Sequence, residues 1–126
     1  MILGLGTDIV EIRRLAQSIE RSGDAFLTKV YTPEELAQAP ERSPRRTEYL
    51  AGRWAAKEAL AKALGTGITA QCRLNEICTL NDTLGRPTIT LTGSAKDSAN
   101  AIGVKHIHIS IAHEKDYAVA TVILEG

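Results

Sequence analysis

The longest stretch without a helix breaker lies between two clear boundary signals, and it predicts the dominant element of the fold. Ser43-Pro44 is typical of a helix start, and Gly65 is typical of a C-terminal cap. Between them only Gly52 departs from a helical composition. We therefore expect one long helix here, and a small chain must build its core around it.

The side chains of this helix predict that neighbours cover it on two faces. At about 100° per residue, one face is an apolar stripe and the other carries very small side chains that permit close backbone approach. The apolar stripe consists of Leu50, Trp54, Ala61 and Leu64, with Lys57 inside it. The small face consists of Gly52, Ala55, Ala56, Ala59 and Ala63. Charge is confined to two seams, with Glu58 and Lys62 on one and Arg53 and Lys57 on the other.

The rest of the first half predicts a strand and two further helices. Asp8 with Glu11 three residues later is typical of a capping box, so we expect a short strand over residues 2–5 and then a helix opened by Asp8. Thr32-Pro33 begins a second, short helix that reaches about Ala39.

The second half predicts antiparallel strands with one small helix. Strands are expected at residues 74–80 and 88–92, and a helix at 94–102. Residues 105–113 and 117–124 predict a hairpin whose second strand is central, because it is apolar on both faces. We expect a single α+β domain over residues 1–126, with an antiparallel sheet packed against the long helix.

The balance of charges argues against non-specific electrostatic binding to nucleic acid or to an anionic membrane. The 126 residues contain 15 Lys plus Arg and 15 Asp plus Glu, so the chain has no formal net charge.

The cysteines and the N-terminal segment predict the compartment. Cys72 and Cys78 match no zinc or redox spacing, and no basic leader precedes them. The apolar segment before Asp8 is too short to span a bilayer. We expect a soluble cytoplasmic protein with no nucleic-acid or membrane partner.

Two carboxylates are candidates for a metal site. Mg²⁺ is typically held by one or two protein carboxylates, with water and substrate phosphate completing the shell. Asp8 and Glu58 meet that requirement if the fold brings them together. The alternatives are a helix cap at Asp8 and a solvated i,i+4 ion pair of Glu58 with Lys62.

The histidines offer a different metal chemistry. His106 and His108 share one face of a predicted strand, and His113 follows as a third imidazole that completes a Zn²⁺ ligand set. The alternative is a polar, half-exposed strand face.

Four segments, in order along nearly the whole chain, resemble the bacterial 4′-phosphopantetheinyl transferases of the holo-(acyl carrier protein) synthase family. The segments are G-L-G-T-D-I at 4–9, Y-L-A-G-R-W-A-A-K-E-A-L-A-K-A-L-G-T-G at 49–67, G-R-P at 85–87 and H-I-S-I-A-H at 108–113. The second is highly specific. One departure is Ala112, where the family often has Ser or Thr.

The resemblance implies transfer of phosphopantetheine from coenzyme A to a serine of apo acyl carrier protein, which releases adenosine 3′,5′-bisphosphate for fatty-acid synthesis. It implies that Asp8 and Glu58 hold Mg²⁺, that Lys62 assists the leaving phosphate, and that Glu58 activates the serine directly or through a metal-bound water. Arg53 would contact phosphate. The remaining candidates for the coenzyme A pocket are Gly65, Thr66, Gly85, Pro87, His108, Ser110 and His113.

The resemblance also implies protein partners. It predicts a homotrimer with active sites at the subunit boundaries, and a first helix that docks an acidic carrier protein. The docking residues would be Arg13, Arg14, Arg21 and Phe26. The alternatives are plain solvated helix surface, a carrier-binding module without catalysis, and a zinc enzyme built on the three histidines.

Overall fold

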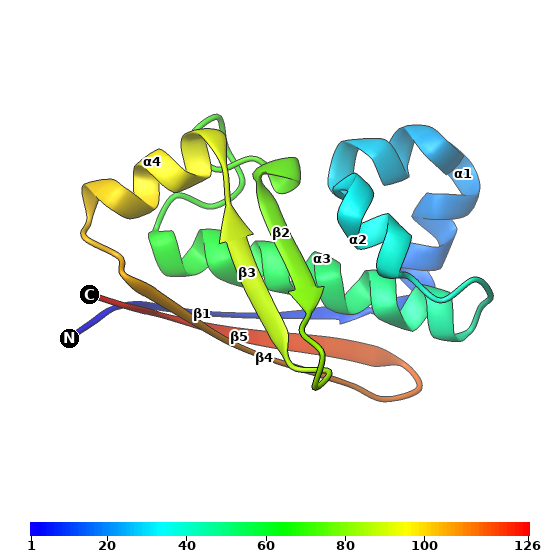
Figure 1. Cartoon of the computed structure of the whole chain (residues 1–126). Helices are drawn as coiled ribbons and strands as arrows, with labels where there is room; N and C mark the ends of the chain where they lie inside the picture. Colours follow the sequence, from blue (N-terminus) through cyan, green and yellow to red (C-terminus); the bar gives the residue numbers. More distant parts are fainter.

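The computed structural model describes residues 1–126, and a long helix runs through its centre. This helix, α3 (Arg45–Leu64), ends at Gly65, whose φ of 81° is the left-handed conformation of a glycine cap. A three-stranded antiparallel sheet in the order β1-β5-β4 lies against it (Figure 1). The strands are β1 (Ile2–Glu11), β4 (His106–His113) and β5 (Tyr117–Glu125). The long helix, the α+β class and the central position of the last strand are confirmed.

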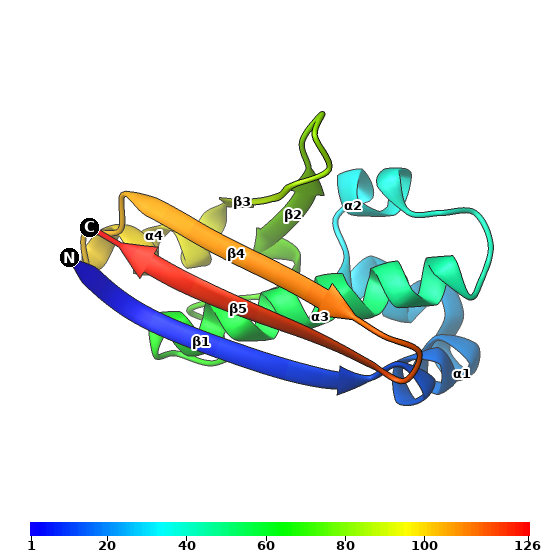
Figure 2. The same ribbon diagram turned by 90° about the horizontal axis from the view of Figure 1, so that it is seen from below.

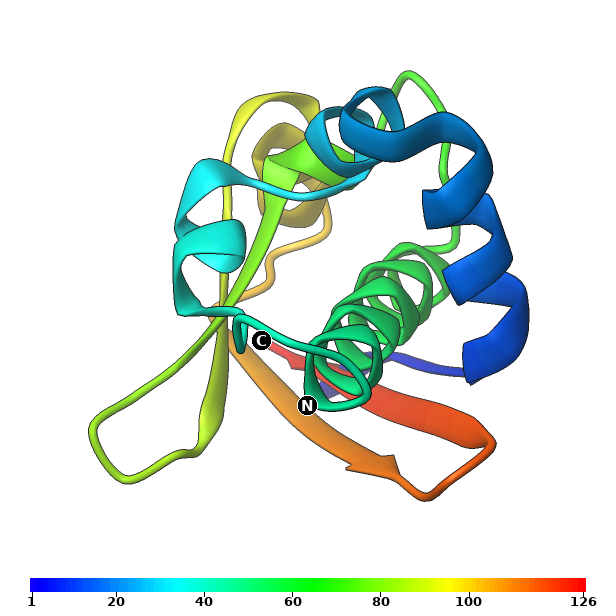
Figure 3. The ribbon, with the colours of Figure 1, turned by 90° about the vertical axis from the view of Figure 1, so that its right-hand side faces the viewer.

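The other elements cover the side of α3 that faces away from this sheet (Figure 3). They comprise α1 (Ile12–Val30), α2 (Pro33–Gln38), a 3-10 turn η1 (Leu74–Glu76), the β2–β3 hairpin (Ile77–Asn81 and Pro87–Leu91) and α4 (Gly93–Ala101). The strand expected from residue 74 therefore begins at Ile77. The structure confirms the helix at Thr32-Pro33, because Thr32 and Glu35 form a reciprocal capping box.

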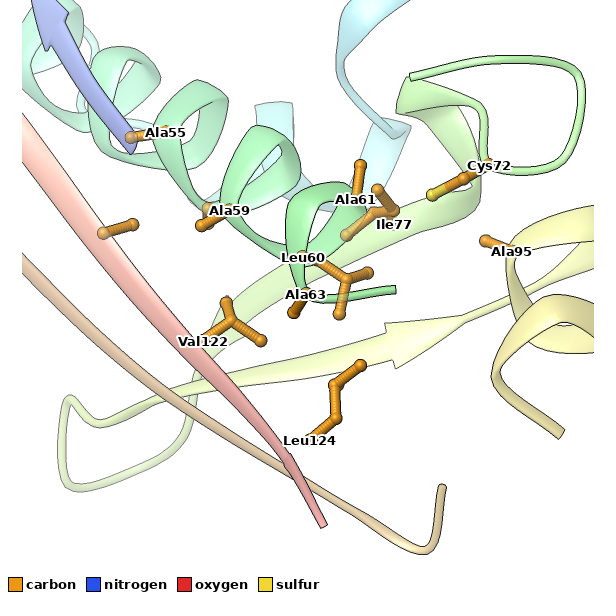
Figure 4. Close-up of a cluster of buried hydrophobic side chains, with 12 residues drawn as sticks. Ala55, Ala59, Leu60, Ala61, Ala63, Cys72, Ile77, Ala95, Val122 and Leu124 are labelled. Carbon is orange, nitrogen blue, oxygen red and sulfur yellow. The ribbon is translucent and has the colours of Figure 1, made fainter. Parts of the chain in front are cut away.

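The core lies on both faces of α3, as its two-faced pattern predicted. On the sheet side, Ala59 and Ala63 lie near Val122 of β5, and Ala55 and Leu124 belong to the same buried cluster (Figure 4). A second buried cluster joins α1 to the N-terminal half of α3 through Leu15, Val30, Tyr31 and Leu50.

Two glycines let β1 lie directly on the small face of α3. A Cβ on Gly6 would overlap the carbonyl oxygen of Ala59, and a Cβ on Gly4 would overlap that of Ala63. The backbones approach more closely than any side chain permits. This contact fixes Asp8, two residues beyond Gly6, over the second half of α3.

The expected helix start at Asp8 is wrong. Strand β1 continues to Glu11, and Asp8 pairs with Ala120 of β5 in the middle of the ladder. Helix α1 begins only at Ile12. The capping-box pattern is local, and the ladder to β5 overrides it because pairing satisfies the backbone groups of this segment that face β5.

The outer face of the three-stranded sheet carries no helix (Figure 2). Large apolar side chains lie exposed on it, with Leu5 66% and Ile9 65% exposed on β1 and Tyr117 and Val119 exposed on β5. None of the helices is both long enough and apolar enough to cross a membrane.

Candidate functional site

Asp8, Glu58 and Lys62 come together where β1 crosses α3. The Lys62 ammonium donates to Asp8 Oδ1 at 3.0 Å and to the carbonyl oxygen of Thr7 at 3.0 Å. Glu58 lies one helical turn before Lys62 and lines the same cavity as Asp8. The fold thus supplies the juxtaposition that sequence spacing alone left open. The alternative ion pair between Glu58 and Lys62 is not formed, because Lys62 turns to Asp8 instead.

The carboxylates lie in a cavity of about 490 Å³ between β1, α1 and α3. Arg14 and Arg21 of α1 line it, and so do the rings of Phe26 and Trp54. These rings are stacked, with centroids 6.0 Å apart. One cavity therefore joins two carboxylates, two exposed guanidinium groups and an aromatic wall.

Glu58 has a perturbed acidity that fits its position. Partial burial raises the pKa of this carboxyl, and the nearby Asp8 carboxylate raises it further, while Lys62 opposes the shift. A carboxyl group whose pKa is raised by a neighbouring carboxylate marks a place where a cation is stabilised.

The donor set fits Mg²⁺ and does not fit a closed structural metal site. The structure contains no cluster of three or more His, Cys, Asp or Glu side chains placed to hold a metal. The residues present supply two carboxylates from two facing elements. Proteins typically supply one or two carboxylate ligands to Mg²⁺, and water and substrate phosphate supply the others.

The zinc alternative is contradicted by the geometry of the three histidines. His108 pairs with Glu125 at 2.9 Å across the β4–β5 ladder, while His113 pairs with Glu48 of α3 at 3.1 Å. The His106 and His108 rings lie on one face of β4 as expected, but the third imidazole belongs to a different cluster. No shared ligand position remains.

Several predicted pocket residues lie away from Asp8. Arg53 is buried on the other flank of α3, where it donates to Asn81 Oδ1 at 2.9 Å and lies 4.2 Å from the centroid of the Tyr49 ring. Arg53 and His113 line a second cavity of about 340 Å³ together with Arg45, Glu48 and Asn81.

The remaining residues predicted for the coenzyme A pocket lie in three places: after α3, in the β2–β3 hairpin and on β4. Gly65 and Thr66 directly follow α3, one turn beyond Lys62. Pro87 pairs with Asn81, which lines the second cavity, in the hairpin whose turn contains Gly85. His108 and Ser110 lie exposed on β4. Within one chain, the residues of β4 and of the β2–β3 hairpin do not line the cavity that holds the carboxylates.

The predicted docking residues also separate. Arg14 and Arg21 line the first cavity and Phe26 forms part of its wall, whereas Arg13 is exposed outside it. Sequence reasoning placed Trp54 in a core stripe and missed its position on the cavity. The available signal was its spacing of four residues from Glu58, which puts both side chains on one face of the helix.

Comparisons with known proteins show the family and the fold. The family model described as the 4′-phosphopantetheinyl transferase superfamily matches residues 4–122. The chain is 50% identical, over 99% of its length and 98% of the relative's, to the holo-[acyl-carrier-protein] synthase of Edwardsiella ictaluri. It superposes with a TM-score of 0.91 and 36% identity on the holo-[acyl-carrier-protein] synthase (AcpS) of Neisseria meningitidis, with all of both chains covered. The Bacillus anthracis synthase, solved in complex with CoA (3′,5′-ADP), matches with a TM-score of 0.83 and 35% identity, covering 98% of this chain and 96% of that one.

Proposed function

The chain belongs to the 4′-phosphopantetheinyl transferase superfamily. We propose that Asp8, Glu58 and Lys62 are the catalytic residues of the transfer reaction. The reaction is transfer of the 4′-phosphopantetheine group from coenzyme A to a serine of apo acyl carrier protein, in the service of fatty-acid synthesis. The products are holo acyl carrier protein and adenosine 3′,5′-bisphosphate. The observation that carries the proposal is the meeting of both carboxylates and Lys62 beside a cavity edged by arginines.

The chain's own groups suit phosphoryl transfer. The serine hydroxyl attacks the β-phosphorus of coenzyme A, the bond to the bridging oxygen breaks, and the nucleotide phosphate leaves with that electron pair. Lys62, 51% exposed and on a flexible stem, reaches the departing phosphate and supplies positive charge or a proton there. Glu58, with its raised pKa, accepts the serine proton directly or through water.

Asp8 and Glu58 would hold the Mg²⁺ ion. When bound, the ion supplies positive charge to the pyrophosphate oxygens and stabilises the charge that develops on transfer. Two carboxylates match the protein share of such a site, and the pyrophosphate supplies the further oxygen ligands.

The carrier protein docks on α1, with Arg14 and Arg21 facing its acidic surface. Their position on the cavity supports this, since a serine presented there comes directly to the carboxylates. Arg13 lies outside the cavity and serves as a peripheral contact. Phe26, stacked on Trp54, supplies an apolar contact at the same edge.

A homotrimer completes the coenzyme A pocket. Two features support it. The outer sheet face leaves Leu5, Ile9 and Val119 exposed, which is the pattern of a surface that a second copy covers. Moreover, Arg53 and the pocket residues on β4 and the β2–β3 turn lie away from Asp8 in their own chain. A neighbouring copy supplies these residues to the carboxylates.

The protein functions in the cytoplasm. Its two cysteines are free, which fits a reducing compartment.

Subunit complementation tests the shared site. Asp8→Asn and His113→Ala chains, each inactive alone, regain part of the activity when they are mixed and refolded together, because some boundaries then contain two intact halves. A mixture that stays inactive although both variants form trimers by sedimentation contradicts the shared pocket. Sedimentation of the wild-type chain as a 13.6 kDa monomer contradicts the trimer itself.

A further inference from the structure

Lys62 holds one oxygen of the Asp8 carboxylate that the proposed cation needs. Its ammonium is 3.0 Å from Asp8 Oδ1, and the Asp8 side chain is only 16% exposed. A cation placed between Asp8 and Glu58 must take up the same carboxylate. An ammonium group and a divalent cation at one carboxylate repel each other, and the partial burial of Asp8 limits how far solvent screens them.

Lys62 is nevertheless free to leave Asp8. Its side chain is 51% exposed, and its second contact is a single hydrogen bond to the Thr7 carbonyl oxygen. A half-exposed pair of this kind is weak, so little free energy is lost when a stronger acceptor arrives. A pyrophosphate bound beside Asp8 is such an acceptor.

We propose that Lys62 acts as a counterion that couples the cation to the phosphate substrate: it opposes cation binding in the free protein and releases Asp8 when a pyrophosphate takes over its ammonium. The proposal rests on the proposed function, because it assumes the cation at Asp8 and Glu58. Two carboxylates and one ammonium carry one net negative charge, and a divalent ion alone reverses it. A pyrophosphate that arrives with the ion restores a net negative site. The divalent ion and the pyrophosphate therefore each bind more tightly when the other is present. Each raises the affinity for the other by the same factor.

Titration of the free protein with Mn²⁺ as a paramagnetic probe tests this without any turnover. Lys62→Met is expected to bind Mn²⁺ about tenfold more tightly than wild type, because one unit charge beside the ion is removed. Lys62→Arg keeps the charge and is expected to stay within about twofold of wild type. Lys96→Met removes an exposed lysine of α4 that forms no ion pair, and it leaves the affinity unchanged. Equal or weaker Mn²⁺ binding by the folded Lys62→Met variant overturns the proposal.

A second titration in the presence of coenzyme A tests the coupling. Coenzyme A is expected to raise the Mn²⁺ affinity of the wild type about tenfold, after correction for Mn²⁺ bound to coenzyme A in solution, and to raise that of Lys62→Met much less. An equal rise in both proteins overturns the coupling. Absence of any Asp8-dependent Mn²⁺ site contradicts both the cation site and this proposal. Normal Mn²⁺ behaviour without transfer to a carrier protein contradicts the proposed function alone.

Discussion

Lys57 and Glu35 form an ion pair of 2.7 Å in which neither side chain is exposed to solvent. Glu35 also accepts hydrogen bonds from the backbone N–H groups of Thr32 and Thr79, while the Lys57 ammonium donates to the carbonyl oxygens of Leu74 and Ile77. The pair ties α2, η1 and β2 to α3, directly beside Glu58. Burial lowers the pKa of Lys57, and the Glu35 carboxylate counteracts that effect.

Breaking this pair is expected to destabilise the fold severely. Lys57→Met leaves a buried carboxylate without its cation and is expected to cost about 3–5 kcal/mol in the free energy of unfolding. Lys62→Met is the matched control, because it breaks a half-exposed pair on the same helix and is expected to cost less than about 1 kcal/mol. Urea unfolding followed by circular dichroism measures both. Similar costs for the two variants would refute the distinction.

The contact of β1 with α3 makes Gly6 irreplaceable. The added methyl group of Gly6→Ala meets the Ala59 backbone, which cannot move aside, so we expect a loss of about 3 kcal/mol or more. Gly52→Ala is the control, because its new methyl group meets only the side chain of Ile111, at 3.1 Å. That change is expected to stay within about 1 kcal/mol of wild type. Thermal and urea unfolding compare the two, and a Gly6→Ala protein as stable as Gly52→Ala would disprove the close contact.

Acid destabilisation is expected to depend on Glu76. Partial burial raises the pKa of this carboxyl, but hydrogen bonds from the Ser94 hydroxyl and from the backbone N–H groups of Arg73, Ser94 and Ala95 outweigh it and lower the pKa below the ordinary 4.5. A depressed folded-state pKa contributes stability that is complete above pH 4.5 and is lost as pH falls through the folded-state value.

Glu76→Gln separates this contribution from the rest. At neutral pH the variant is expected to be about 1 kcal/mol less stable, because it loses charged acceptors at the start of α4. The difference should shrink as the pH falls below 4.5, where the wild-type carboxyl itself becomes protonated. Unfolding free energies measured across this range check the prediction, and a constant difference would argue against it.

The cavity position of Arg14 predicts a selective effect on the carrier protein. Arg14→Glu places a negative charge where the acidic partner docks, so the KM for carrier protein is expected to rise about tenfold while the KM for coenzyme A stays nearly unchanged. Arg13→Glu makes the same charge change outside the cavity and is expected to have a smaller effect. Steady-state kinetics with each substrate varied in turn decide the matter. Equal increases in both KM values would contradict docking at Arg14.

The sequence predicted α3 well because its pattern is long and its boundary signals are chemical. Pro44 and Gly65 mark the ends, and the small face indicated that a neighbour can approach closely. Asp8 was placed in the wrong element, because a capping box is visible within the four residues 8–11 whereas the ladder to β5 joins segments more than 100 residues apart. Local patterns do not report such distant pairing.

The candidate site divides in the same way. The resemblance selected Asp8, Glu58 and Lys62, but only the fold explains why Lys62 pairs with Asp8 and not with Glu58. Nothing in the sequence spacing indicates that Glu35 is buried against Lys57. The stacking of Phe26 of α1 on Trp54 of α3 is a contact between two helices, and spacing within either helix does not report it.

The mass of an apo acyl carrier protein after incubation with this chain and coenzyme A tests the central claim most directly. With Mg²⁺ present, the carrier is expected to gain the mass of one phosphopantetheine group on its serine. The gain should disappear with EDTA, return with added Mg²⁺, and be absent with Asp8→Asn or Glu58→Gln chains that remain folded. A carrier protein bound by the wild-type chain but unchanged in mass would contradict the account, and so would undiminished transfer by the Asp8→Asn chain.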